Sequence, residues 1–298
     1  MTHSPSAEPI TSVISTKPNL PSYDIIVDDV KSCIEEDIKT GDLTANLIPE
    51  TAIINGKIIA RETGILCGTA WADQAFKQVD PAIEVEWKAN DGDVVHDQTT
   101  LCRLHGNARA ILTAERQALN LMQTLSGTAT TANRYVQEIK HTKAKLLDTR
   151  KTIPGLRDAQ KYAVLCGGGM NHRMGLYDGI LIKENHLRCG KSLTDVVKTA
   201  LASVPEGTLV ELEVERIEQM QEGIEAGIQR VLLDNFTLEE LKEAVEINQD
   251  RIDLEASGNV SIETIKEIAE TGVDFISSGA ITKHVRALDL SLLFDMEL

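Results

Sequence analysis

Short apolar segments that end in polar residues recur through the second half of the chain, and helical patterns lie between them. The polar ends are evenly spaced, with 21 residues from Glu213 to Asp234, 23 from Asp234 to Ser257 and 21 from Ser257 to Ser278. Apolar strands that alternate with helices are typical of a parallel sheet covered on both faces. The six predicted strands lie within 145–151, 179–185, 209–215, 230–235, 252–259 and 274–280.

A repeating unit of roughly 20–30 residues suits a (β/α) barrel, complete or open. A doubly wound open sheet is the structural alternative. We predict the fold class α/β and prefer the barrel. The carboxyl ends of barrel strands and their loops form the active face of such folds. We therefore expect the polar residues that end the strands to meet at one mouth.

The first part of the chain mixes the two kinds of pattern. Helical spacing predicts helices over 28–38 and 69–80, and alternation predicts a hairpin of strands over 52–68. Residues 83–106 favour strands that break at an Asn-Asp-Gly turn. The long helical stretch over 107–140 contains Gly127, where we predict a break and a possible domain junction.

The charge of the chain excludes some classes of partner. Lys and Arg number 30 against 46 Asp and Glu, for a formal net charge of −16, whereas nucleic-acid binding needs a broad basic surface. No apolar run approaches the roughly 20 residues that span a bilayer, and the N-terminus has no secretory signal pattern. The five cysteines form no Cys-x-x-Cys pair, which argues against structural zinc and a disulfide framework. We expect a cytoplasmic protein with no nucleic-acid or membrane partner.

One segment reverses the acidic balance. Between Arg150 and Lys191 there are eight basic residues, three acidic residues and two histidines. A local cationic patch in an acidic protein suits a small polyanionic ligand better than a nucleic acid.

The predicted strand ends carry groups that suit such a ligand. Lys183 closes an apolar strand, so its ammonium must meet an anion or lose its charge. Glu213 and Asp234 close two further strands and could hold a metal ion or sugar hydroxyls. The pairs 257–258 and 278–279, both Ser-Gly, follow the last two strands, where backbone N–H groups form the phosphate site of many barrels.

Other interpretations stay open from the residues alone. Arg150 and Lys151 could be a solvated surface pair, and the loop after the glycines 167–169 could simply be flexible, because those glycines match no nucleotide-binding fingerprint. A barrel aldolase or lyase could use Lys183 as a Schiff base. A non-catalytic protein could bind phosphorylated metabolites. The clustered cations and paired phosphate loops favour transfer chemistry on a phosphorylated sugar.

Longer motifs are also present, in order, from about Asp29 to Phe294. They are "ERQALNLMQTLSGTAT", "DTRKTIPGLR", "KYAVLCGGGMNHRMGLYDGILIKENH", "ELEVE", "LLDN", "EASGNV" and "TGVDFISSGAITK". Together they resemble the quinolinate phosphoribosyltransferase family of NAD biosynthesis. One departure is "EDIKTGDLT", where Lys39 replaces a glycine of the family pattern, and we expect only a local loop change there. A drifted paralogue of the molybdenum-transport-associated type is an alternative, against which the intact "DTRKT" and "NHR" weigh.

The resemblance implies a fold in four parts, with a type II phosphoribosyltransferase-like open (β/α) barrel. A flexible lead-in occupies 1–22, an N-terminal α/β sandwich 23–115 and the catalytic barrel 116–280, and the segment 281–298 returns to the N-terminal domain. The resemblance also implies a homodimer or an assembly of dimers.

The implied reaction joins quinolinate to phosphoribosyl pyrophosphate with Mg2+, giving nicotinate mononucleotide, pyrophosphate and CO2. Arg150, His172 and Arg173 would bind the quinolinate carboxylates, with Arg116 donated from the neighbouring subunit.

The resemblance also implies roles at the phosphoribosyl end. Lys151 and Lys183 would face the diphosphate and the reacting centre, and Glu213 and Asp234 would hold ribose hydroxyls and the metal; these four are the expected catalytic residues. The other expected substrate-binding residues are Thr149, Ser257, Gly258 and Asn259, and Ser278, Gly279 and Ala280.

Overall fold

The structure is a computed structural model that describes residues 10–11, 17–189 and 192–295. The chain forms two compact units. The first comprises Met1–Asn133, Thr152–Gly168 and His284–Leu298, and the second comprises Arg134–Lys151 and Gly169–Lys283. Most of the lead-in predicted over 1–22 lies outside the described residues. Among the described residues, no helix is both long and apolar enough to cross a lipid bilayer.

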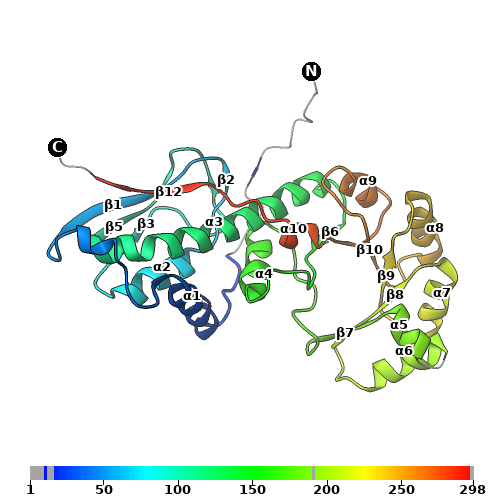
Figure 1. The fold of residues 1–298 in the computed structure, drawn as a ribbon. Coiled ribbons are helices and arrows are strands. Elements are labelled where there is room, and N and C mark those ends of the chain that lie inside the picture. The colour runs from blue at the N-terminus through cyan, green and yellow to red at the C-terminus, as the bar shows by residue number, and fades with distance from the viewer. Residues whose placement is uncertain (1–9, 12–16, 190–191, 296–298) are drawn as a thin grey trace. The chain divides into compact units, whose positions relative to one another are not determined.

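A four-stranded antiparallel sheet lies at the centre of the first unit (Figure 1). Its order is β12 (Leu290–Phe294), β1 (Ile53–Ala60), β5 (Thr100–Asn107) and β3 (Glu84–Trp87). The C-terminal strand β12 pairs with β1, so the end of the chain belongs to this unit. The remaining elements of this unit are α1 (Tyr23–Ile38), η1 (Ala45–Leu47), β2 (Gly64–Ile65), α2 (Thr69–Val79), β4 (Val94–Val95), α4 (Arg157–Cys166) and most of α3 (Ala108–Ile139).

The hairpin predicted over 52–68 is wrong. Strand β1 pairs with β5 and β12, and the short β2 pairs with β4 instead of turning back on β1. Buried side chains of α3 explain this, because the Ile65 amide donates to Thr130 Oγ1 and the Cys67 amide donates to Ser126 Oγ, each at 2.9 Å. Alternation within the segment predicts the strands but not their partners.

The break predicted at Gly127 is also wrong, because α3 runs without interruption from Ala108 to Ile139. Because the glycine has no side chain, a second backbone segment can approach the helix closely at this point. A Cβ at Gly127 would lie 2.2 Å from the Arg286 carbonyl oxygen and 3.1 Å from Ala287 Cα. The segment that leads into β12 therefore passes directly over this point of the helix.

We predict that Gly127→Ala lowers the thermal unfolding midpoint. Helix propensity alone would favour alanine by about 1 kcal/mol, but the backbone clash should cost about 1–3 kcal/mol. Gly223→Ala in α7 (Ile217–Ala226) is the matched control, because its Cβ would meet only side-chain atoms, Leu212 Cδ2 at 2.7 Å and Ile228 Cγ2 at 3.5 Å. A higher midpoint for Gly127→Ala than for wild type would contradict the account.

A six-stranded parallel sheet forms the centre of the second unit (Figure 1). All six strands predicted from the repeat are confirmed. In spatial order they are β6 (Lys145–Leu147), β11 (Phe275–Ser277), β10 (Asp253–Ser257), β9 (Arg230–Asp234), β8 (Leu209–Val214) and β7 (Gly179–Ile182).

The strand order distinguishes the two architectures considered from the sequence. Strands β7 to β11 follow one another across the sheet in chain order, whereas a doubly wound sheet reverses direction at a switch point. Strands β6 and β7 form the two edges in the described part of the chain, so this is the open form of a barrel. The helices of this unit are α5 (Glu184–Cys189), α6 (Leu193–Ala202), α7, α8 (Leu238–Asn248), α9 (Ile265–Ala269) and α10 (Ala280–Lys283).

The parallel register decides which side chains share a face. Glu213 pairs with Leu232, which pairs with Glu255, and Asp234 pairs with Ser257. Because paired residues in neighbouring strands point to the same side, these side chains lie on one face in successive layers. The layer with Asp234 and Ser257 is at the carboxyl edge.

Candidate active site

A pocket of about 410 Å3 lies at the carboxyl edge of the six-stranded sheet. It brings together side chains from β6 through β11 and from the loop after α4, all within the second unit. Nine of the residues predicted from the sequence line it: Thr149, Arg150, Lys151, His172, Arg173, Lys183, Glu213, Asp234 and Ser257.

The two predicted carboxylates lie at the ends of β8 and β9. Lys183 Nζ forms an ion pair with Glu213. Burial raises the pKa of Asp234, and the nearby charge of Glu213 raises it further. Two partly buried carboxylates that repel each other create a site that favours a cation. Mg2+ is commonly bound by one or two carboxylates together with substrate phosphates, so Glu213 and Asp234 fit the predicted metal.

Two arginines form the cationic side of the pocket. Arg173 Nη1 donates to the Gly179 carbonyl at 3.0 Å. Burial lowers the pKa of Arg173, and the neighbouring Arg150 lowers it further. Two guanidinium groups held close together against their mutual repulsion would be stabilised by an anion between them.

The predicted phosphate loops have the close backbone approaches that such loops need. A Cβ at Gly258, which has φ +94°, would lie 2.2 Å from Asn235 Oδ1, and Asn259 is also left-handed, with φ +51°. A Cβ at Gly279 would lie 2.8 Å from Lys151 Cδ and 3.2 Å from Thr149 Oγ1, so a larger residue there would displace these side chains. Because these two glycines have no side chain, each loop can pack directly against the neighbouring residues.

One expected phosphate donor is already engaged. The Ser278 amide donates to the Leu147 carbonyl at 3.1 Å, in continuation of the β11–β6 pairing, so this amide already has a backbone partner. The Ser278 hydroxyl donates to the Val260 carbonyl at 3.2 Å and joins the two loops.

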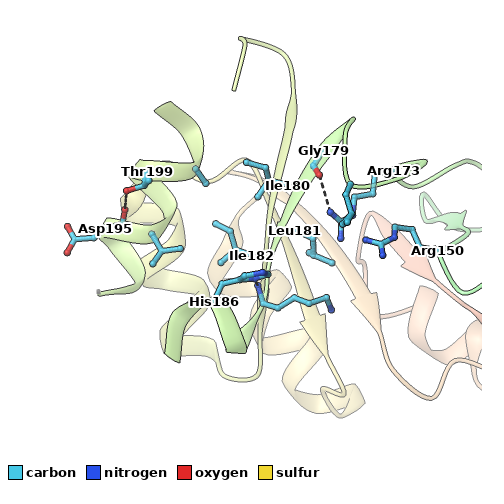
Figure 2. A pocket seen from close by; sticks show the side chains of 13 residues that line it. Arg150, Arg173, Gly179, Ile180, Leu181, Ile182, His186, Asp195 and Thr199 are labelled. Atoms are coloured by element: carbon cyan, nitrogen blue, oxygen red, sulfur yellow. Dashed lines mark hydrogen bonds between the residues drawn. The ribbon is translucent and has the colours of Figure 1, made fainter. Parts of the chain in front are cut away.

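A second pocket of about 830 Å3 lies over the edge strand β7, next to the first (Figure 2). Its walls are mainly apolar side chains of β7 and α6, including Ile180, Ile182 and Val196. Arg150, Arg173 and Lys183 line both pockets. The cations therefore stand at a boundary between a polar mouth and an apolar surface.

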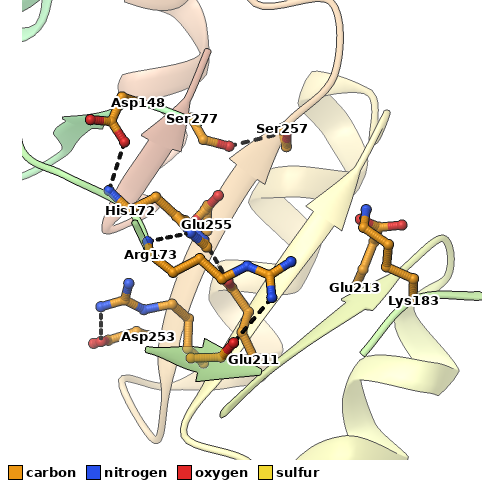
Figure 3. Close-up of polar contacts among 12 residues, drawn as sticks. Asp148, His172, Arg173, Lys183, Glu211, Glu213, Asp253, Glu255, Ser257 and Ser277 are labelled. Atoms are coloured by element: carbon orange, nitrogen blue, oxygen red, sulfur yellow. Dashed lines mark hydrogen bonds and ion pairs between the residues drawn. The ribbon is translucent and has the colours of Figure 1, made fainter. Parts of the chain in front are cut away.

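Beneath the mouth lies a buried acidic group that was not among the predicted site residues (Figure 3). Glu211 and Glu255 have fully buried side chains, and His172 Nε2 lies 2.7 Å from Glu211 Oε2 and 3.6 Å from Glu255 Oε2. Burial raises the pKa of Glu255 to about 8, and the charge of Glu211 contributes to this shift. Burial also raises the pKa of Glu211.

Asp148 is a further member of the site, at one of the strand ends where the sequence predicted the active face. It is fully buried at the end of β6, and its Oδ1 accepts the His172 backbone N–H at 3.0 Å while Oδ2 accepts from Asn171 Nδ2. The register offered a usable signal for Glu211 and Glu255, since each lies two residues before a predicted site residue on the same strand face. For Asp148 the signal was its place at the end of a predicted strand.

Arg116 lies in the first unit, beside a separate pocket that also includes Asp37, Asp42 and Thr113. The loop that contains the Lys39 departure borders the same pocket. Lys39 has φ 42° and ψ −99°, and the Gly41 amide donates to the Ile38 carbonyl at 2.7 Å. This turn geometry favours glycine at the position that Lys39 occupies.

The Schiff-base alternative finds little support in this geometry. Lys183 would have to leave its ion pair with Glu213 before its amine could attack a carbonyl. Open parallel sheets bind their ligands at the carboxyl edge. Fold and pocket together define an α/β enzyme that acts on an anionic, phosphorylated substrate.

Comparisons with known proteins specify the family. The family description "Quinolinate phosphoribosyl transferase, N-terminal domain" matches residues 42–126, and "Quinolinate phosphoribosyl transferase, C-terminal domain" matches residues 128–293. The chain belongs to the quinolinate phosphoribosyltransferase family.

Similar proteins occur in plants and bacteria. The chloroplastic nicotinate-nucleotide pyrophosphorylase (carboxylating) of Arabidopsis thaliana is 42% identical over 301 residues, which cover 94% of this chain and 86% of that protein. A probable nicotinate-nucleotide pyrophosphorylase (carboxylating) of Bacillus subtilis is 39% identical, with coverage of 86% and 89%. The solved nicotinate-nucleotide pyrophosphorylase of Francisella tularensis is 46% identical with a TM-score of 0.90, and covers 93% of this chain and 98% of its own.

Glu255 is expected to make the stability of the protein depend on pH. Its pKa is about 8 in the folded state against an ordinary value of 4.5. Between these values the folded state holds a proton that the unfolded state has released, so this stabilisation is complete below about pH 4.5 and is lost as the pH rises to about 8. The slope should not exceed about 1.4 kcal/mol per pH unit.

The test compares thermal unfolding of wild type and Glu255→Gln from pH 5 to pH 9. Glutamine does not titrate, so the variant should gain stability relative to wild type as the pH rises, and the gain should level off above about pH 8. Glu239→Gln, on the exposed face of α8, is the control. A difference between wild type and Glu255→Gln that is constant across this range would contradict the buried proton.

Proposed function

We infer that the protein transfers the phosphoribosyl group of phosphoribosyl pyrophosphate to quinolinate and releases CO2, giving nicotinate mononucleotide for NAD biosynthesis. The observation that carries this inference is the pocket in which two guanidinium groups, two lysines and two carboxylates meet at the edge of a parallel sheet. Family membership supplies the identity of the substrates.

The arginines account for recognition of a diacid. Arg150 and Arg173 would each pair with a substrate carboxylate through two parallel N–H donors, a geometry that lysine does not reproduce. Arg116 of a second copy would add a third guanidinium in a homodimer. His172 differs from the arginines because both of its ring nitrogens already have protein partners. In our proposal it therefore supports the carboxylate site from below.

The phosphoribosyl end would lie along β8 to β11. The loops 257–259 and 278–280 would enclose the 5′-phosphate, with Thr149 beside them. Lys151 would face the diphosphate. These placements rest on the close contacts of Gly258 and Gly279, because a loop without side chains lets backbone donors reach a phosphate.

Breaking the bond to pyrophosphate leaves a positive charge on the ribose ring. Glu213 and Asp234 would stabilise that charge and orient the ribose hydroxyls, and Lys183 would offset the charge of the leaving group. Mg2+, held by the two carboxylates together with the diphosphate, supplies further neutralisation when bound. No covalent enzyme nucleophile is needed.

Decarboxylation follows from the chemistry of the new bond. The pyridine nitrogen attacks the anomeric carbon and becomes positively charged. The C2 carboxylate then leaves as CO2, because the electron pair left on C2 is stabilised by the adjacent positive nitrogen, and C2 takes up a proton. The arginines hold the ring in place through both carboxylates until CO2 leaves.

We further propose that the protein works as a homodimer or an assembly of dimers in the cytoplasm. The apolar pocket over β7 supports an assembled form, because it borders the cations of the substrate site. Plant relatives carry chloroplastic or mitochondrial names, so location varies within the family.

The direct test incubates purified protein with phosphoribosyl pyrophosphate, Mg2+ and either quinolinate or nicotinate, and measures nicotinate mononucleotide. Product should form from quinolinate only, because nicotinate lacks the second carboxylate. Product from both acids would mean that the arginine pair does not select a diacid. No product from either, with folded protein, would favour the drifted paralogue.

We predict that Arg150→Lys raises the KM for quinolinate by about 10- to 100-fold, the loss expected for one charge-assisted bidentate contact. The KM for phosphoribosyl pyrophosphate should change much less. Arg188→Lys is the control, since Arg188 is exposed and paired with Glu184 outside the pocket. An unchanged KM for quinolinate in Arg150→Lys would remove this arginine from the carboxylate site.

A further inference from the structure

The His172–Glu211–Glu255 group is the most unusual feature of the site that the proposed reaction leaves unexplained. All three side chains are at least nine-tenths buried, and two of them are acids. Burying a carboxylate costs several kcal/mol unless its interactions offset the loss of water. An apolar layer would fill the same space at less cost, so the group calls for a functional explanation.

Hydrogen bonds define the tautomer of the histidine. The Arg173 backbone N–H donates to His172 Nδ1 at 2.8 Å, so Nδ1 carries no proton. The ring proton is therefore on Nε2, which donates to Glu211 Oε2 at 2.7 Å. A neutral histidine in one tautomer thus links the backbone of Arg173 to the floor of the pocket.

This tautomer also excludes a metal ion at the group. His172, Glu211 and Glu255 have ligand atoms within 4.8 Å of one another, a spacing compatible with metal binding. A metal would need the lone pair of Nε2, but Nε2 must keep its proton while Nδ1 accepts the Arg173 amide. The group is a hydrogen-bonded support.

Glu255 completes this support. Its Oε2 lies 3.6 Å from His172 Nε2, and burial together with the charge of Glu211 raises its pKa. Arg230, on the neighbouring strand β9, favours the charged form of Glu211. The Glu211 carboxyl group thus accepts from His172, while Glu255 lies against the same ring nitrogen.

The residue at the other end of this chain of contacts is a substrate ligand in our proposal. The His172 amide is held by Asp148, and the Arg173 amide is held by the His172 ring. The Arg173 guanidinium is then directed to the Gly179 carbonyl and stands beside Arg150. Any rotation of the His172 ring would remove the contact that orients the Arg173 backbone.

We propose that Glu211 is a positioning residue for substrate recognition, which acts through His172 to hold Arg173 in the orientation that binds a quinolinate carboxylate. This inference rests on the proposed function, because it takes quinolinate as the anion that Arg173 binds.

A matched pair of variants isolates the hydrogen bond. Glu211→Gln keeps an acceptor oxygen for His172 Nε2 and a donor for Glu255, whereas Glu211→Met fills nearly the same volume with no acceptor for His172. Glu215→Gln is the control, because Glu215 follows the same strand with its side chain exposed. Calorimetric binding of quinolinate, steady-state kinetics for both substrates and thermal unfolding are measured for each protein.

We expect Glu211→Met to weaken quinolinate binding and raise its KM by roughly tenfold or more, since small errors of orientation are costly at such sites. The KM for phosphoribosyl pyrophosphate should stay within about twofold. The unfolding midpoint should fall only modestly, because the loss of a buried carboxyl group offsets part of the cost of the unpaired Nε2–H. Glu211→Gln should recover most of the quinolinate affinity.

Three outcomes would overturn the inference. Normal quinolinate binding by Glu211→Met would show that the support is not needed. A Gln variant as impaired as the Met variant would show that the acceptor is not the operative feature. A fall in the midpoint together with equal losses for both substrates would indicate a structural role alone. If wild type itself fails to bind quinolinate, the proposed function fails instead.

Discussion

The parallel register of the six-stranded sheet is the constraint on which the rest of the site depends. Because the strands run the same way, alternate residues face one side and the carboxyl ends meet at one edge. Glu213, Asp234 and Ser257 reach the same mouth from three neighbouring strands for this reason. A slip of one residue in β8 would turn its glutamates to the opposite face.

The same register stacks charges in layers. Asp234 and Ser257 lie in the layer at the edge, Glu213 and Glu255 lie in the next layer, and Glu211 lies in the layer below that. Among the cations, Lys183 directly follows β7, Arg150 and Lys151 follow β6, and Arg173 comes from the loop that also carries His172. The site thus combines acids placed by strands with cations placed by loops. The buried acids connect the two sets through one histidine.

Much of this arrangement follows from local pattern in the sequence. The recurring apolar segments predicted all six parallel strands, and the polar residues at their ends predicted six of the thirteen residues that line the mouth. The family resemblance added Thr149, His172 and Arg173. Strand ends are a strong signal because a buried parallel strand tolerates polar residues mainly where it leaves the sheet. The predictions that were wrong concern contacts between segments that are distant in the sequence.

Three examples show why those contacts escape local pattern. Strand β1 pairs with the last strand of the chain, and alternation says nothing about partners. A glycine such as Gly127 suggests a break in a helix, but here its missing side chain lets the backbone of Arg286 pass close to the helix. Glu211 resembles any alternating strand acid until the register places it against His172 and Glu255. Each case required three-dimensional neighbours that the sequence does not name.

The measurement that tests the central claim most directly follows a label in the 2-carboxylate of quinolinate. The protein is mixed with labelled quinolinate, and labelled CO2 and pyrophosphate are counted with and without phosphoribosyl pyrophosphate. The account predicts one labelled CO2 for each pyrophosphate and none without the sugar donor, because the carboxylate can leave only after the ring nitrogen has become positive. Release of CO2 without the donor, or of pyrophosphate without CO2, would contradict it.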